Sequence, residues 1–246
     1  MKGMADAAGI SHGAIKRINL FPELIRASCS IIGAWGPATA NTGLLQVRAL
    51  DWDDSAPMSK YPLVSVYHYT DDEKAQPYAN FAWAGVVGSL AGFSTNVGIS
   101  EKFRGPDHRN DSSWNGEPWM YVLRDVLQYG TDLESGIGIM WDAMKTWKIY
   151  VGLGATSDNV FRGIEYGHDG LIIFDDKNFT TPNATVHPKM DGVVYWDKHD
   201  KQPSNDPCLG ASLEAGYGSL TPEYLFRNST AMLMTGDTLL AVYDFQ

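Results

Sequence analysis

The sequence predicts an α+β fold, a four-layer αββα sandwich in which two stacked, mainly antiparallel sheets are covered by helices. Two blocks of short β-rich runs flank a pair of amphipathic helical segments. A hydrophobic content of 44% and 25 glycines suit a sheet-rich chain with a sizeable core. No Pro/Ser-rich linker, low-complexity run or internal repeat divides the 246 residues, so we expect one main domain.

The first part of the chain predicts a helix followed by a β-hairpin. Residues 10–25 carry apolar side chains at mixed three- and four-residue spacings, interrupted only by Pro22, which indicates a helical segment. Two apolar runs, 29–35 and 44–52, then flank the turn-forming Asn41-Thr42-Gly43. This arrangement is typical of two antiparallel strands joined by a turn.

The rest of the chain supplies the second sheet and the covering helices. Alternating or continuous apolar runs predict strands at 61–69, 81–87 and 92–100. After a polar loop over 101–117, apolar residues recur on one face of a helix at 118–129, and a second helix is expected at 132–145. Strands return at 147–153, 170–174, 192–196 and 239–245.

The formal net charge of −10 argues against a nucleic-acid partner, and no Lys/Arg cluster provides a local exception. No apolar run approaches the ~20 residues that span a bilayer, so we expect no transmembrane segment. Residues 1–28 also lack the apolar core of a signal peptide. The histidines show no metal-ligand spacing and no nucleotide motif occurs, so we expect no cofactor.

Four acceptor sequons for N-glycosylation occur, at Asn110, Asn178, Asn183 and Asn228. Chance predicts about one or two in a chain of this composition. The mild excess favours a lysosomal or secreted glycoprotein, the alternative being a cytoplasmic protein with unused sequons. Since the secretory route requires a targeting segment, we expect the true N-terminus of the precursor to be missing from this chain.

Cys29 opens the first strand of the hairpin and is the candidate nucleophile. A thiol attacks only as thiolate, and no His or Lys adjoins Cys29 in the sequence. If the bond between Ser28 and Cys29 is cut, the new α-amine, with a reference pKa of ~8, lies beside the sulfur and can act as the base. The reaction is then acyl transfer to the thiol, release of an amine and hydrolysis of the thioester. In the same geometry Cys29 can attack the preceding carbonyl, which predicts autocleavage.

The hairpin ends in an Arg-x-x-Asp motif formed by Arg48 and Asp51. A guanidinium is a fixed cation with five donors, and Asp51 can hold either this group or a new α-ammonium by a charge-assisted hydrogen bond. We expect both side chains to fold back beside Cys29. The alternative is an ordinary surface ion pair.

Short motifs spread over most of the chain carry a family resemblance. They are Met4-Ala-Asp6, Cys29 at a strand start, Arg48-Ala-Leu-Asp51, Ser94-Thr-Asn-Val-Gly-Ile-Ser100, Leu123-Arg-Asp-Val-Leu127, Tyr195-Trp-Asp-Lys-His199 and Thr235-Gly-Asp-Thr238. Together they resemble the N-terminal-nucleophile (Ntn) hydrolases of the peptidase C45 and acid-ceramidase-like group, to which acyl-CoA:6-aminopenicillanate acyltransferase-like enzymes belong.

The resemblance implies catalytic roles for Cys29, Arg48 and Asp51, and an oxyanion donor at Asn96. The family usually has an acidic residue after this Asn, whereas Val97 follows it here. The alternative is that Asn96 only adopts a turn conformation. For a second oxyanion donor, the candidates are Asn183 and the polar residues of 196–199.

The resemblance also implies how the chain is organised. Residues 29–246 form the Ntn-hydrolase domain. Residues 1–28 are a propeptide-like piece, or the helical end of a small subunit, which stays associated after autocleavage between Ser28 and Cys29.

The function implied is a cysteine-nucleophile amidohydrolase or acyltransferase acting on linear acyl amides, with a lipid-like small molecule as substrate. Two other functions stay open, a phospholipase-B-like acyl esterase and a catalytically silent family member that acts as a structural or binding subunit. A disulfide between Cys29 and Cys208 would exclude thiol catalysis. Five tryptophans are candidates for the wall of an apolar acyl pocket, the alternative being core packing: Trp35, Trp52, Trp83, Trp114 and Trp119.

Overall fold

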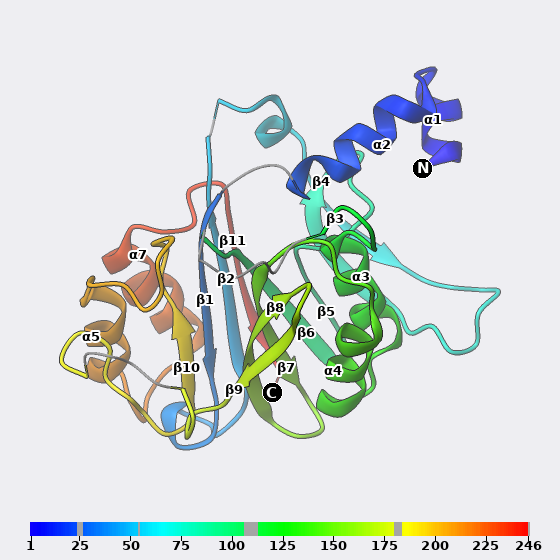
Figure 1. The fold of residues 1–246 in the computed structure, drawn as a ribbon. Coiled ribbons are helices and arrows are strands. Elements are labelled where there is room, and N and C mark those ends of the chain that lie inside the picture. The colour runs from blue at the N-terminus through cyan, green and yellow to red at the C-terminus, as the bar shows by residue number, and fades with distance from the viewer. Residues whose placement is uncertain (24–26, 54, 106–112, 180–183, 246) are drawn as a thin grey trace.

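The computed structural model describes residues 1–23, 27–53, 55–105, 113–179 and 184–245. Two antiparallel sheets are stacked face to face, and helices cover the outer face of each (Figure 1). The predicted α+β, four-layer αββα sandwich is therefore confirmed.

The smaller sheet has four strands in the order β10-β1-β2-β11, and each neighbouring pair is antiparallel. Its strands are β1 (Ser28–Ala34), β2 (Leu45–Asp51), β10 (Val193–Trp196) and β11 (Leu239–Asp244). Its outer face packs against helices that follow β10 in the chain: α5 (Cys208–Ala215), α6 (Pro222–Tyr224) and α7 (Thr230–Leu233), with a π-helical turn over Leu225–Ser229.

The larger sheet has seven antiparallel strands in sequence order, β3 to β9. They are β3 (Pro62–Tyr67), β4 (Tyr78–Trp83), β5 (Ala91–Ser94), β6 (Val97–Phe103), β7 (Ile149–Ala155), β8 (Val160–Gly167) and β9 (Gly170–Phe174). Two helices, α3 (Trp119–Tyr129) and α4 (Leu133–Asp142), cover its outer face (Figure 1). None of the helices described is long and apolar enough to cross a membrane.

The two sheets meet through a dry, tightly packed layer. Ile31, Phe161 and Trp196 are buried in this layer. Gly33 permits the close approach of the sheets, because a Cβ at this position would lie 2.1 Å from the ring of Phe161. The layer therefore fixes the spacing of β1 above the strands of the larger sheet.

The N-terminal segment is helical, as predicted, with α1 (Lys2–Ala8), α2 (His12–Leu20) and a 3₁₀ turn over Phe21–Glu23. Its helices project from one end of the sandwich (Figure 1). Two buried polar side chains attach it. Asn19 donates to Gly85 O and accepts from Val87 N, at 2.8 Å each. The Glu23 carboxylate accepts from Trp119 N at 2.8 Å and from the Thr146 hydroxyl at 3.0 Å.

The structure differs from the prediction around residues 92–117. The single strand expected at 92–100 is two strands, because Ser94 Oγ accepts from the backbone N–H groups of Asn96 and Val97 and stabilises a tight turn there. The second of these strands continues through Glu101 to Phe103, where a loop was expected. Strand β8 and the helices after residue 207 were not predicted.

Candidate active site

Cys29 is the second residue of β1, and its side chain lies between the two sheets with an exposure of 1%. The predicted hairpin is confirmed. Its register pairs Cys29 with Leu50, Ile31 with Arg48, and Ser28 with Asp51. Because alternate residues of a strand face the same side, Arg48 and Leu50 of β2 point into the same inter-sheet space as Cys29.

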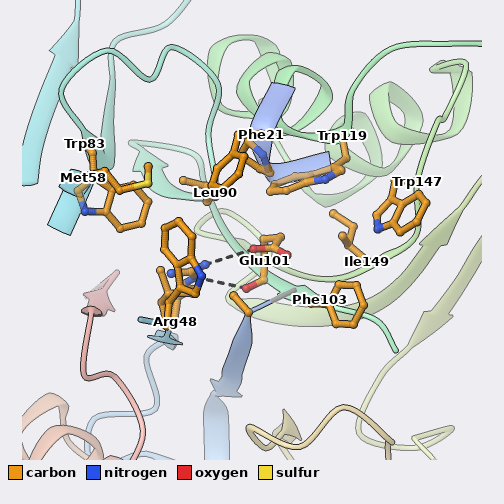
Figure 2. A pocket seen from close by; sticks show the side chains of 14 residues that line it. Phe21, Arg48, Met58, Trp83, Leu90, Glu101, Phe103, Trp119, Trp147 and Ile149 are labelled. Carbon is orange, nitrogen blue, oxygen red and sulfur yellow. Dashed lines mark hydrogen bonds and ion pairs between the residues drawn. The ribbon is translucent and has the colours of Figure 1, made fainter. Parts of the chain in front are cut away.

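Arg48 is completely buried beside this sulfur. Its Nη2 atom donates to Cys29 Sγ at 3.7 Å and to Glu101 Oε2 at 3.2 Å, while its Nε donates to Glu101 O at 3.3 Å. Figure 2 shows the guanidinium and the carboxylate pointing toward one another at the base of a pocket. The surface ion pair considered for Arg48 and Asp51 is therefore wrong, since Arg48 is buried and pairs with Glu101.

Glu101 is the site residue that the sequence did not reveal. It was placed at the start of a polar loop, whereas it belongs to β6. A usable signal existed, because alternation through 97–103 puts Glu101 on the same face as the buried Val97 and Ile99. A carboxylate in that pattern requires a buried cation, and Arg48 supplies it.

Burial is the largest influence on the pKa values of Cys29 and Glu101. It raises the pKa of the Cys29 thiol to about 11, although the neighbouring Arg48 guanidinium acts in the opposite direction. Burial likewise raises the pKa of the Glu101 carboxyl, again opposed by Arg48. The thiol of the uncut chain is consequently protonated at neutral pH, so it needs a base before it can attack.

Asp51 lies at the end of β2, opposite Ser28, rather than against Arg48. Thr235 Oγ1 donates to its Oδ2 at 2.6 Å, and Gly236 N donates to its Oδ1. The Thr235 hydroxyl also lies 3.0 Å from Ser30 Oγ. The loop that precedes β11 thus fixes the Asp51 carboxylate beside the start of β1.

The structure does not bring Asn96 to Cys29. Asn96 lies in the β5–β6 turn, where its Nδ2 donates to Gln76 Oε1 at 2.5 Å. Glu101 follows it by five positions along the chain, a length of about 17 Å along a strand. The expectation that Asn96 is the oxyanion donor is corrected accordingly, and the turn alternative describes its position.

An apolar pocket lies near the start of β1, where Ala27 and Arg48 line it. Arg48 and Glu101 form its polar base (Figure 2). Phe21, Pro22 and Ala27 of the N-terminal segment line it, and its free volume is only about 40 Å³. Three of the five predicted tryptophans contribute to its wall, together with one that was not predicted: Trp52, Trp83, Trp119 and Trp147. Trp35 instead packs between the sheets and Trp114 is 83% exposed.

A second pocket near the start of β1 is polar and open. Its free volume is about 380 Å³, and Ser28 and Asp51 line it. Lys198 and His199, which belong to the polar run 196–199 expected near the site, also line it together with Asp200 and Asp237. An apolar and a polar pocket therefore both lie near the start of β1.

The remaining predicted residues lie away from this group or outside the described part of the chain. Cys208 begins α5, and both cysteines are free thiols, so the disulfide alternative is wrong. Asn178 and Asn228 are exposed, as a glycan would require. Asn110 and Asn183 fall outside the described residues.

Comparison with known proteins gives relatives in sequence and in structure. No known protein-family model matches the chain. Two proteins of Dictyostelium discoideum, dcd1A and dcd1B, are 37% and 36% identical to it over 100% and 99% of its length. These matches cover 57% and 49% of the two relatives, so the chain spans about half the length of the curated relatives it matches.

A solved structure, the Caenorhabditis elegans N-acylethanolamine-hydrolyzing acid amidase (NAAA) ortholog, superposes on this chain with a TM-score of 0.60. The match covers 88% of this chain and 93% of that one, at 11% sequence identity. At this identity the likeness concerns the fold alone. The two stacked antiparallel sheets with their covering helices thus have the Ntn-hydrolase fold of that amidase, the fold that the resemblance in the sequence implied.

Proposed function

We propose that this chain is a cysteine-nucleophile Ntn hydrolase that acts on acyl amides, as an amidohydrolase or acyltransferase, after it has cut its own Ser28–Cys29 bond. The observation that carries the proposal is the buried Cys29–Arg48–Glu101 group at the start of β1, on an Ntn-hydrolase fold. A structural ion pair alone would not need a free thiol within 3.7 Å of its cation.

The chemistry follows from the position of each group. Once the bond is cut, the Cys29 α-amine takes the proton of its own thiol, and the thiolate attacks the acyl carbon of the substrate. The protonated amine then returns the proton to the leaving amine as the carbon–nitrogen bond breaks. Water hydrolyses the resulting thioester, or a second amine takes the acyl group in a transferase reaction.

Arg48 and Asp51 have separate tasks in this scheme. Arg48 stabilises the thiolate electrostatically, and its two hydrogen bonds to Glu101 hold the guanidinium in place. Asp51 is fixed opposite residue 28, where it can accept a hydrogen bond from the new α-amine of Cys29. A charge-assisted bond of this kind orients the amine toward its own sulfur.

The two pockets supply a rationale for the substrate class. The acyl chain occupies the tryptophan-lined pocket, whose lining is mainly apolar apart from Arg48 and Glu101 at its base. The hydrophilic leaving group occupies the pocket next to Ser28 and Asp51. A free volume of about 40 Å³ has room for only a few water molecules, so Phe21, Pro22 and Ala27 must move before an acyl chain can enter.

The exposed sequons at Asn178 and Asn228 favour a lysosomal or secreted site of action.

The test follows the purified chain over time. We expect two fragments that stay associated, the larger beginning Cys-Ser-Ile-Ile by N-terminal sequencing, and a thiol-directed acyl probe should label Cys29. Cys208→Ala serves as the matched control, since it removes the other free thiol without touching the site. Labelling at Cys208 alone, or full amide hydrolysis by an intact chain, would contradict the proposal. Hydrolysis of acyl esters without acyl amides would instead support the phospholipase-B-like alternative.

A further inference from the structure

Lys102 carries a buried amine that the proposed mechanism does not use. It lies in β6 next to Glu101, and its side chain is 0% exposed. Its Nζ atom has no hydrogen-bond partner among the residues that the structure describes. An ammonium without acceptors is unfavourable in such a place, which favours the neutral amine. A residue kept under these conditions needs an explanation.

Contacts between β2 and β6 show how the two sheets are aligned at this point. Gln46 Nε2 donates to Ser100 Oγ at 2.8 Å, and Arg48 Nε donates to Glu101 O at 3.3 Å. Strands β2 and β6 therefore run in the same direction where they face each other. Strand β1 is antiparallel to β2. Moving backward along β1, from Ile31 to Cys29, therefore corresponds to moving forward along β6.

This alignment places Lys102 across from the nucleophile. Ile31 lies over Gly152, where a Cβ would come within 2.8 Å of Ile31 Cγ2. Gly152 pairs with Ser100, and the next same-face position along β6 is Lys102. Cys29 is the corresponding next position along β1, so both side chains enter the same inter-sheet space.

Charges around Lys102 come from both sheets and from the segment after β10. Burial lowers the pKa of the Lys102 amine, opposed by Cys29 and then by Asp197, Asp200 and Glu101. Burial raises the pKa of Cys29, so both shifts favour the neutral forms of the amine and the thiol. A neutral amine opposite a protonated thiol can accept its proton.

The uncut chain lacks the base that the mature enzyme would use. Before cleavage, the nitrogen of Cys29 is an amide and cannot accept the thiol proton. We propose that Lys102 is the general base for the first reaction of the chain, the cleavage of its own Ser28–Cys29 bond. This inference rests on the proposed function, because it supplies the step that creates the α-amine.

The step balances as follows. Cys29 Sγ attacks the carbonyl carbon of Ser28, and the Sγ proton passes to Lys102 Nζ, directly or through one water. The tetrahedral intermediate collapses with rupture of the Ser28–Cys29 carbon–nitrogen bond, and Nζ returns the proton to the departing nitrogen. The product is a thioester between the Ser28 carbonyl and Sγ. Water then hydrolyses it to a Ser28 carboxylate and a free thiol, and the new α-amine takes over as the base.

Two substitutions separate a base from a mere cation. Lys102→Met removes both the proton acceptor and the charge in a similar volume, whereas Lys102→Arg keeps a cation that does not lose its proton. We expect both variants to cut themselves at least about 100-fold more slowly than the wild type, as loss of a general base requires. The measurement is conversion of the full chain to two fragments by gel and mass spectrometry.

Cleavage by an added protease, in place of autocleavage, distinguishes a defect in maturation from a defect in turnover or in folding. The recognition sequence of a site-specific protease that accepts Cys after its cleavage point replaces residues 24–28, and the protease is co-expressed with the chain. Protease-cut Lys102→Met should hydrolyse an acyl amide within about threefold of the protease-cut wild type, since the α-amine then serves as the base. Maturation of Lys102→Met or Lys102→Arg at the wild-type rate overturns the inference. So does a protease-cut Lys102→Met that is inactive while the protease-cut wild type is active. If the wild type never cuts itself, both proposals fail. If only its protease-cut form is inactive, the hydrolase function alone fails.

Discussion

The two pockets beside the Ser28–Cys29 bond differ in both chemistry and state. The apolar pocket has a free volume of about 40 Å³ and is closed by the N-terminal segment, whereas the polar pocket has about 380 Å³ and is open. The start of β1 therefore lies near one small pocket and one larger pocket. The difference teaches that the N-terminal segment fills the apolar side of the candidate site, while it contributes no lining residue to the polar side.

Removal of the sulfur between the two pockets should have the largest effect. Cys29→Ala should abolish both autocleavage and hydrolysis, because both proposed steps begin at Sγ, while Cys29→Ser should mature slowly and turn over poorly. Fragment analysis and an acyl-amide assay measure the two steps. Cys208→Ala should keep wild-type rates, and residual turnover by Cys29→Ala would show that another group is the nucleophile.

Disruption of the ion pair at the base of the apolar pocket should come next. Arg48→Met should remove turnover and destabilise the fold by about 3–5 kcal/mol, because it leaves the buried Glu101 carboxylate unpaired. The double variant Arg48→Met, Glu101→Gln should recover most of the stability and none of the activity. Chemical denaturation and kinetics per folded molecule separate these effects. Recovery of activity in the double variant would reduce the pair to a structural role.

Partial opening of the closed pocket should give a moderate effect. Phe21 lines the apolar pocket and its ring lies 5.9 Å from that of Trp52. Phe21→Ala in a Cys29→Ala chain, which stays uncut, should bind a fluorescent fatty acid about tenfold more tightly, a gain of about 1.4 kcal/mol. Phe226→Ala is the matched control, since Phe226 is exposed on the outer side of the other sheet. Equal affinities in the two variants would show that the segment does not restrain acyl binding.

Substitution of Glu23, which attaches the N-terminal segment, should have the smallest effect. It should change how the melting temperature depends on pH. Burial raises the pKa of Glu23 above its usual value. Its protonated form is therefore favoured in the folded state, so its contribution to stability is full below pH 4.5 and is lost as the pH rises through the folded pKa. Glu23→Gln should reduce the fall in melting temperature between mildly acidic and neutral pH. An unchanged slope would assign that dependence to another group, such as Glu101.

The sequence predicted those parts of the site that are local in the chain. The hairpin turn at 41–43 and the apolar runs on either side set the register that brings Arg48 to Cys29. Glu101 and Lys102 could not be placed in this way, because β6 comes close to Arg48 and β1 only through the stacking of two sheets. Asn96 was misplaced because the Ser94 hydroxyl, by accepting two backbone N–H groups, makes a turn where one strand was expected.

The central position of β1 has a consequence for any chain that begins at Cys29. A new chain terminus normally frays, since its first residues have few partners. Here β10 and β2 flank β1, and Asp51 is tied to the loop before β11. The conformational entropy of the first residue is therefore lost during folding instead of at each catalytic turn. In the proposed mechanism, this order would keep the thiol and the α-amine of one residue at high effective concentration, which a mobile terminus could not provide.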